Sequence, residues 1–140
     1  MDPRVANDRD TVISRLRPQL EALPGLRLAI LHGSAAAGLL RPDSDVDLAL
    51  AFDEAMNTEQ KLKLYNALSA VCGREMDIAD LLVIGGFFLS QVLSQGTLII
   101  NNDPSLYYSL AIKSLDFMED MQPIIQREQL RRIKEFANGK

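Results

Sequence analysis

The sequence lacks the residues on which several common kinds of site depend. It contains one cysteine, Cys72, one histidine, His32, and no tryptophan. A single cysteine excludes an internal disulfide and any metal site built from several thiolates. A single histidine leaves little from which to build a zinc centre or a Ser–His–Asp triad. We therefore expect Cys72 to be a small apolar residue of a helix.

Neither an excess of positive charge nor a long apolar run is present. The formal net charge is −4, so the broad basic surface of a passive nucleic-acid-binding protein is not expected. No apolar segment approaches the about 20 residues that span a bilayer, and the first residues lack the apolar centre of a signal peptide. Hydrophobic residues make up 47% and charged residues 24%, as is typical of a folded domain. We expect a soluble, cytoplasmic protein that binds neither membranes nor, directly, nucleic acid.

The length of 140 residues predicts one domain, spanning residues 1–140. Short apolar runs predict four strands, within residues 26–31, 46–52, 76–83 and 97–100. Apolar residues at helical spacing predict helices within residues 13–23, 57–73, 88–93 and 104–136. Pro18 should kink or split the first of these helices, and Pro123 should kink the last. Together the elements predict an α+β fold, an α/β sandwich, that ends in a long C-terminal helix.

The segment with the clearest chemical meaning reads Gly33-Ser34, ten further residues, and then Asp45-Val46-Asp47. Residues two apart in a strand point to the same face, so Asp45 and Asp47 should face one way. Two neighbouring carboxylates repel each other, and a cation between them removes that repulsion. Magnesium is the expected cation, because it takes oxygen ligands and bridges carboxylates to substrate phosphates. Two such ions about 3.5–4 Å apart can serve the attacking and leaving oxygens in nucleotidyl transfer.

The rest of the second strand should separate a core face from a ligand face. Val46, Leu48 and Leu50 alternate with the aspartates and should point into the core. Ala49 and Ala51 continue the aspartate face with small side chains, which we expect to leave room for a ligand.

Gly33 and Ser34 directly follow the first apolar run and predict a phosphate site. A glycine lets the backbone approach a phosphate closely, and the exposed N–H groups of the turn that follows attract anions. The hydroxyl of Ser34 can add one more donor. Consecutive strands should therefore carry a phosphate cradle and a metal site.

Asp77 is our choice for the third carboxylate of this site. It lies near the start of the third strand between Met76 and Ile78, where a lone acid needs a partner or an open cleft. It can help to hold the metal and accept the proton of an attacking hydroxyl. Asp80 is the second choice, because it falls on the opposite face of the strand and fits a strand-end or capping role better.

These residues resemble the nucleotidyltransferase superfamily related to DNA polymerase β, whose signature is Gly-Ser, a spacer and Asp-x-Asp. The stretch 31–50 is similar in particular to the minimal nucleotidyltransferases, the MNT antitoxins that are encoded beside HEPN ribonuclease toxins. The resemblance implies a short mixed sheet with helices packed mainly on one face. It also implies that ATP and two magnesium ions bind here, with the phosphates on Gly33, Ser34 and Ser44 and the metal ions on Asp45, Asp47 and Asp77.

One position departs from the pattern of these relatives. Minimal members often have an arginine four residues after the motif glycine, and this chain has Ala37 there. Arg41 lies further along and is the candidate to reach the triphosphate instead; the alternative is a solvated turn residue. Without a replacement cation, affinity for the triphosphate should be lower. The three acids are nevertheless all present, which argues against an inactive relative.

The resemblance implies an ATP-dependent protein adenylyltransferase that moves AMP onto a tyrosine of a partner HEPN toxin and so acts as its antitoxin, in a hetero-oligomer. Three alternatives stay open. One is a nucleotidyltransferase for a small-molecule hydroxyl, although the short chain leaves little to build an acceptor pocket. Another is an antitoxin that acts by contact alone, through its C-terminal helix with Tyr107, Tyr108, Phe117, Met118 and Met121. The third is self-modification of Tyr65, Tyr107 or Tyr108.

Overall fold

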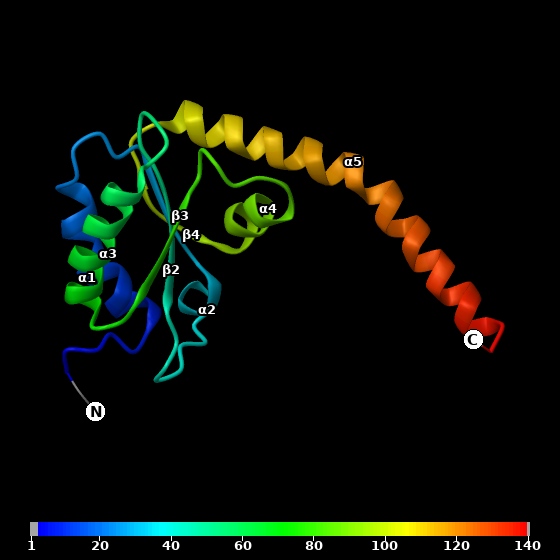
Figure 1. The fold of residues 1–140 in the computed structure, drawn as a ribbon, viewed down its shortest axis with the longest axis horizontal. Helices are drawn as coiled ribbons and strands as arrows, with labels where there is room; N and C mark the ends of the chain where they lie inside the picture. The colour runs from blue at the N-terminus through cyan, green and yellow to red at the C-terminus, as the bar shows by residue number, and fades with distance from the viewer. Residues whose placement is uncertain (1–2, 140) are drawn as a thin grey trace.

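A mixed four-stranded sheet forms the centre of the protein (Figure 1). The computed structural model describes residues 3–139. The strands are β1 (Leu28–His32), β2 (Val46–Ala51), β3 (Met76–Asp80) and β4 (Thr97–Asn101), in the order β3-β2-β1-β4. Strand β1 pairs antiparallel with both β2 and β4, whereas β2 and β3 are parallel. The predicted mixed sheet of four strands is confirmed.

Residues 3–139 contain five helices, which are α1 (Arg9–Glu21), α2 (Gly33–Ala36), α3 (Thr58–Cys72), α4 (Gly86–Gln95) and α5 (Pro104–Ala137). Helix α1 runs through Pro18, so the expected split of that helix is wrong. Pro18 is exposed, and its carbonyl still accepts a hydrogen bond from the N–H of Ala22. A proline therefore costs this helix one hydrogen bond without ending it.

Helices lie on both faces of the sheet and bury two apolar clusters. Helices α1 and α3 cover one face, where Leu16 and Leu68 pack with Leu48 of β2. Helix α4 and the start of α5 cover part of the other face, where Leu89 packs against Ile30 of β1. The strands read as apolar runs because both faces are buried over most of their length.

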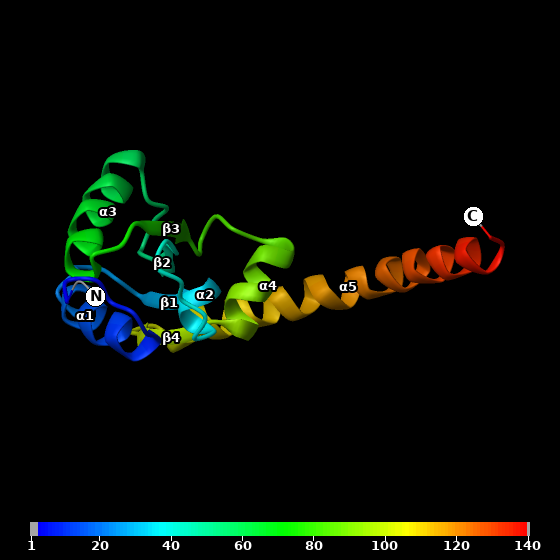
Figure 2. The same ribbon diagram turned by 90° about the horizontal axis from the view of Figure 1, so that it is seen from below.

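Helix α5 begins against the body of the protein and then leaves it as an arm (Figures 1 and 2). Its start is capped by Asp103, and its last buried residue is Ser114. The helix continues through Pro123 and bends over its length. We call residues 124–137 the distal arm. No helix within residues 3–139 is both long enough and apolar enough to cross a bilayer.

Candidate active site

Three polar residues lie side by side at one end of three adjacent strands. In the register, His32 of β1 is the partner of Asp47 of β2, and Asp47 is the partner of Asp77 of β3. Asp47 and Asp77 alternate with residues that pack under α1 and α3, so both carboxyl groups point to the face that carries α4. The ring of His32 meets the ring of Phe88 of α4 edge to face, with centroids 5.7 Å apart. The structure thus brings Asp47 and Asp77 together, as the sequence predicted.

Gly33 follows His32 directly and touches Asp47. Its φ of +68° lies in the left-handed region, which favours glycine. An added Cβ at this position would lie 2.1 Å from Oδ2 of Asp47. Gly33 and the half-buried Ser34 open the short helix α2, beside the carboxyl group of Asp47. A side chain at position 33 would therefore displace the central carboxylate of the site.

The charge of Asp47 is costly in the absence of a cation. Its pKa is raised to about 6, first because its surroundings are partly desolvated, then because of the charge and a shared hydrogen bond of Asp77, and finally because of the charge of Asp45. Neighbouring carboxyls that share a proton are ready to exchange it for a metal ion. Asp45, Asp47 and Asp77, which we call the acidic cluster, are therefore the candidate ligands of a divalent cation.

The acidic cluster is open rather than a closed cage. Asp45 and Asp77 are exposed and Asp47 is half-buried. Within residues 3–139, no three His, Cys, Asp or Glu side chains are already gathered around a common metal position. A magnesium ion here would take its remaining ligands from water and substrate phosphates, which is its usual mode of binding in phosphoryl-transfer sites.

Asp80 has a structural role on the opposite face of β3. It is 2% exposed, and its carboxyl group accepts hydrogen bonds from the backbone N–H of Met56 at 2.7 Å and of Leu82 at 2.9 Å. These bonds satisfy two donors where β3 ends and where the segment before α3 passes it. The interpretation of Asp80 as a strand-end residue is confirmed.

Arg41 and Ser44 belong to the turn that leads into the acidic cluster. The hydroxyl of Ser44 accepts a hydrogen bond from the N–H of Arg41 at 2.9 Å, and the N–H of Ser44 donates to the carbonyl of Arg41 at 3.1 Å. The Ser44 oxygen thus closes the turn. The side chain of Arg41, four residues before Asp45, is exposed. Ala37 is exposed at the end of α2.

The room expected beside Ala49 and Ala51 is filled by protein, so this expectation is wrong. Both alanines are fully buried with Leu81, Leu89 and other residues under α4. Their small side chains admit a helix rather than a ligand. Ala49 and Ala51 therefore leave no room for a ligand.

Two residues near the cluster were missed by sequence reasoning. The Nε2 atom of His32 is buried and has no hydrogen-bond partner within residues 3–139. Burial lowers the pKa of His32, and the charge of Asp77 opposes that shift. Arg74 is 7% exposed and binds backbone carbonyls of the turn before Asp45. His32 directly precedes Gly33, so its place beside the site could have been predicted from the sequence. The sequence around Arg74 contains no feature that indicates its role.

The amino-acid sequence matches known nucleotidyltransferases over most of its length. The family described as Polymerase beta, Nucleotidyltransferase matches residues 15–105, which include Gly33 and the acidic cluster. The protein adenylyltransferase MntA of Shewanella oneidensis is 24% identical over 117 residues, which are 82% of this chain and 80% of that protein.

Solved structures show the same fold. A chain in a crystal structure of a toxin–antitoxin with AMP-PNP superposes with a TM-score of 0.66 at 22% identity, over 86% of this chain and 98% of that chain. A chain in the structure of a tri-AMPylated Shewanella oneidensis HEPN toxin in complex with MNT antitoxin superposes with a TM-score of 0.63 at 18% identity, over the same shares of the two chains.

Proposed function

The chain belongs to the Polymerase beta nucleotidyltransferase family, and from this premise we propose that it transfers AMP from ATP to a tyrosine of a HEPN-type toxin and so acts as the antitoxin. The observation that carries the proposal is the pairing of Asp47 with Asp77 beside Gly33. The similar protein MntA is a protein adenylyltransferase, and the similar solved structures are toxin–antitoxin complexes, one with AMP-PNP and one with an AMPylated toxin. The reaction needs ATP, so we assign the protein to the cytoplasm.

In the proposed reaction the acidic cluster organises the reacting groups. The tyrosine oxygen forms a bond to the α-phosphorus of ATP while the bond from that phosphorus to pyrophosphate breaks. Two magnesium ions held by Asp45, Asp47 and Asp77 would lower the pKa of the acceptor hydroxyl and stabilise the leaving pyrophosphate. Asp77 also accepts the proton of the attacking hydroxyl. Most of the rate gain comes from positioning and electrostatic stabilisation.

The backbone at Gly33 and the hydroxyl of Ser34 would bind the triphosphate next to this cluster. Gly33 has no side chain in the way, and both residues are accessible from solvent. Ser44 and Arg41 would add contacts to phosphate from the neighbouring turn. Their place one to four residues before Asp45 supports that role, and Arg41 is the cation that would stand in for the arginine absent at Ala37.

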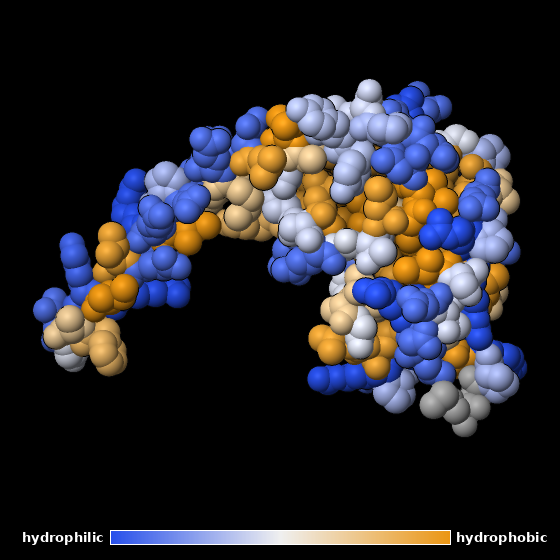
Figure 3. Space-filling model, turned by 180° about the vertical axis from the view of Figure 1, so that it is seen from behind, coloured by the Kyte–Doolittle hydropathy of each residue, from blue (hydrophilic) through white to orange (hydrophobic). Residues whose placement is uncertain are grey.

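The distal arm supports a protein as the acceptor. It exposes large apolar side chains, among them Leu130, Ile133 and Phe136, the last with 84% of its surface exposed. Figure 3 shows a broad hollow between the arm and the body, and in Figure 1 this hollow lies on the side of α2 and α4, which is also the side of the acidic cluster. A protein bound along the arm would therefore face the proposed catalytic groups.

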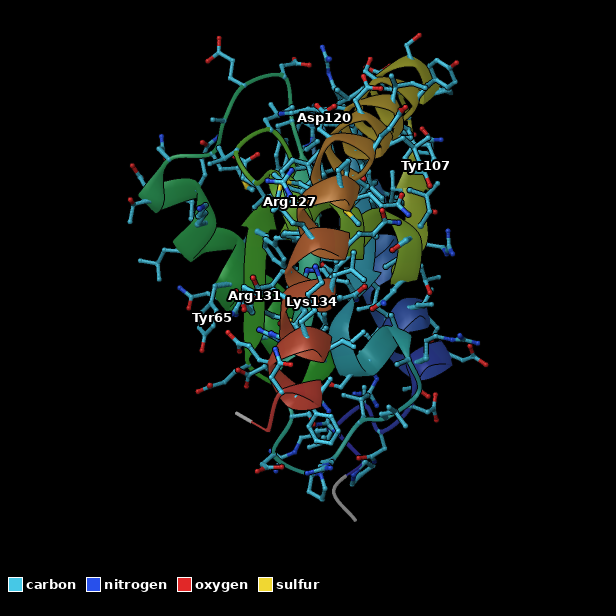
Figure 4. All side chains as sticks on the ribbon, turned by 90° about the vertical axis from the view of Figure 1, so that its right-hand side faces the viewer. Tyr65, Tyr107, Asp120, Arg127, Arg131 and Lys134 are labelled. Carbon is cyan, nitrogen blue, oxygen red and sulfur yellow. The ribbon has the colours of Figure 1, made fainter. Side chains whose placement is uncertain are left out.

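The distal arm also carries basic residues. Figure 4 shows Arg127, Arg131 and Lys134 along it. Arg131 is held by Glu128 and Glu135 of the same helix. Arg127 and Lys134 have no ion pair within residues 3–139, and apolar contact beside these two charges suits a toxin surface that is apolar and edged by carboxylates.

A second candidate function is neutralisation by contact alone, and the exposed arm favours it too. The residues that we expected to form the contact surface fit it only in part, because Phe117 is packed edge to face against Phe87 while Tyr108 is 68% exposed. Self-modification of Tyr65 is less favoured. Tyr65 packs into the cluster under α1 and α3, across the sheet from Asp47, and Figure 4 shows Tyr65 and Tyr107 on opposite sides of the body.

Intact mass spectrometry of the partner toxin tests the proposal. We expect mass gains in whole AMP units after incubation with this protein, ATP and Mg²⁺, and none without Mg²⁺. Asp45→Ala/Asp47→Ala should abolish the gain. Asp10→Ala/Asp116→Ala, which removes two exposed carboxylates outside the site, is the matched control and should leave it intact. A toxin that is bound and silenced without any gain in mass would replace the enzymatic proposal with contact alone.

A further inference from the structure

Arg74 is a buried guanidinium that joins three segments of the chain. It lies between the end of α3 and the start of β3, and it is 7% exposed. Its Nη1 atom donates to the carbonyl of Arg41 at 2.8 Å and to the carbonyl of Ser44 at 2.9 Å. Its Nε atom donates to the carbonyl of Ala6, and its Nη2 atom lies 3.4 Å from Oδ1 of Asn7. All its acceptors are uncharged.

No carboxylate within residues 3–139 lies within 4.0 Å of this guanidinium, in contrast to Arg27 and Arg131. Removing a charged group from water is costly unless hydrogen bonds replace the lost hydration. Hydrogen bonds from a charged donor are stronger and more directional than those between neutral groups. The carbonyls that surround Arg74 are therefore held at defined positions, which a mobile surface side chain would not achieve.

The turn that Arg74 binds is the one that carries Asp45. Reciprocal hydrogen bonds between Arg41 and Ser44 close this turn, and Arg74 bridges the carbonyls of both residues. On the other side of Asp45, the N–H of Val46 donates to the carbonyl of Glu75 at 2.9 Å. Both peptide groups that flank Asp45 are thus bound to the pair Arg74-Glu75.

We propose that Arg74 is a positioning residue that sets the carboxyl group of Asp45 relative to Asp47 and Asp77. Asp77 is on β3, which begins directly after Glu75. The same short segment therefore places Asp77 through the strand and Asp45 through the guanidinium. The catalytic part of this inference rests on the proposed function, whereas the effect on the turn does not.

Hydrogen–deuterium exchange of the full chain tests the effect on the turn without any substrate. The variant is Arg74→Met, and the matched control is Arg15→Met. Arg15 donates to carbonyls of Pro3, Arg4 and Val71, so it holds the same N-terminal segment but does not reach the turn. We expect exchange over residues 38–48 to become about tenfold faster in Arg74→Met and to stay unchanged in Arg15→Met.

Unchanged exchange over residues 38–48 in a folded Arg74→Met protein would overturn the proposal, and so would equal acceleration in both variants. If Arg74→Met does not fold, Arg74→Lys takes its place. A lysine keeps the charge but lacks the planar fork that reaches several carbonyls at once. It should still speed exchange over residues 38–48, and full protection in Arg74→Lys would refute the role of the fork.

Kinetics of toxin adenylylation test the catalytic part. Arg74→Met should raise the Mg²⁺ concentration for half-maximal rate about tenfold or more, with the KM for the toxin unchanged. In an Asp45→Asn background the same substitution should have little further effect, because it acts through Asp45. Equal effects in both backgrounds would refute this route. If the wild-type protein transfers no AMP, the proposed function fails, and hydrogen exchange alone then decides whether Arg74 holds the turn.

Discussion

The Oδ2 atom of Asp47 lies in the space where a side chain at position 33 would begin, 2.1 Å from an ideal Cβ of Gly33. Gly33 directly follows the last residue of β1, and it meets Asp47 because His32 and Asp47 are paired in the sheet. This contact explains why a glycine and an Asp-x-Asp pair, separated by a spacer, are needed as a unit. The glycine thus provides the room that the carboxyl group of Asp47 occupies.

Replacing Gly33 by alanine should destroy activity, whereas replacing Gly38 should not. Both glycines have a positive φ, +68° and +74°, but nothing lies within 4 Å of an added Cβ at Gly38. Each alanine should cost about 1–2 kcal/mol of stability from the left-handed backbone. Only Gly33→Ala should also displace Asp47 and lower the transfer rate on the order of a hundredfold. Equal rates for the two variants, measured per folded molecule, would contradict the proposed contact.

Asp77 and Asp80 should separate activity from stability. Asp77→Asn should lower the transfer rate on the order of a hundredfold, with little change in the free energy of unfolding, because Asp77 is exposed. Asp80→Ala should leave two backbone N–H groups without an acceptor, which costs about 1–3 kcal/mol. Urea unfolding and rate measurements on both variants check the pair. Loss of activity in a fully folded Asp80→Ala protein would show that the two roles are wrongly divided.

The ionisation of Asp47 should make metal-free stability fall as pH rises. Its pKa of about 6 lies above the ordinary value of 3.8, so the folded state holds a proton that the unfolded state has already released near pH 5. The stability from that proton is present at low pH and is lost as pH rises through about 6. In EDTA, the Tm of the wild type should therefore fall between about pH 5 and about pH 7.5 relative to that of Asp47→Asn.

Magnesium should reverse this dependence, because the ion binds the ionised carboxylate and displaces the proton. The Mg²⁺ concentration needed for half-maximal activity should rise as pH falls below about 6. The charge of Asp45 raises the pKa of Asp47 less than Asp77 does. Asp45→Asn should therefore shift the pH profile less than Asp77→Asn. A profile that is flat across this range would contradict the assignment of Asp47 as a metal ligand.

Charges on the distal arm should weaken binding of the toxin without unfolding the antitoxin. Ile133 and Phe136 are 63% and 84% exposed, so Ile133→Asp/Phe136→Asp should leave the Tm nearly unchanged. If the arm is the contact surface, the Kd for the toxin should rise about tenfold or more. The control Gln126→Asp/Gln129→Asp adds the same charge to the same arm at exposed polar positions and should have a much smaller effect. Isothermal titration calorimetry measures the Kd of both variants. An equal rise in Kd would show that the added charge alone weakens binding.

The face of the sheet on which Asp47 and Asp77 lie was predictable, because strand alternation is a local rule. Strand alternation alone places Asp47 and Asp77 away from the core face, and the register then makes them neighbours. The same alternation assigned Asp80 to the opposite face. None of these predictions required knowledge of what covers the sheet.

The features that sequence reasoning missed all depend on contacts between distant segments. Arg74 binds the carbonyls of Ala6 and Arg41, which lie 68 and 33 positions away from it in the sequence. A backbone acceptor can belong to any residue type, so the sequence does not reveal it. Small residues at Ala49 and Ala51 are compatible with an open pocket or with a close-packed helix, and only the position of α4 decides between them. The course of α1 through Pro18 likewise depends on how much a single lost hydrogen bond costs in a helix packed along its length.

The parallel pairing of β2 with β3 has a consequence for how the protein folds. Strands β1 and β2 are antiparallel and close in sequence, so they can pair early. The partners Asp47 and Asp77 meet only after the chain has crossed over the sheet through α3, and non-local pairings of this kind form slowly. We therefore expect a nascent chain on the ribosome to form much of its hydrophobic core while it still lacks enzymatic activity.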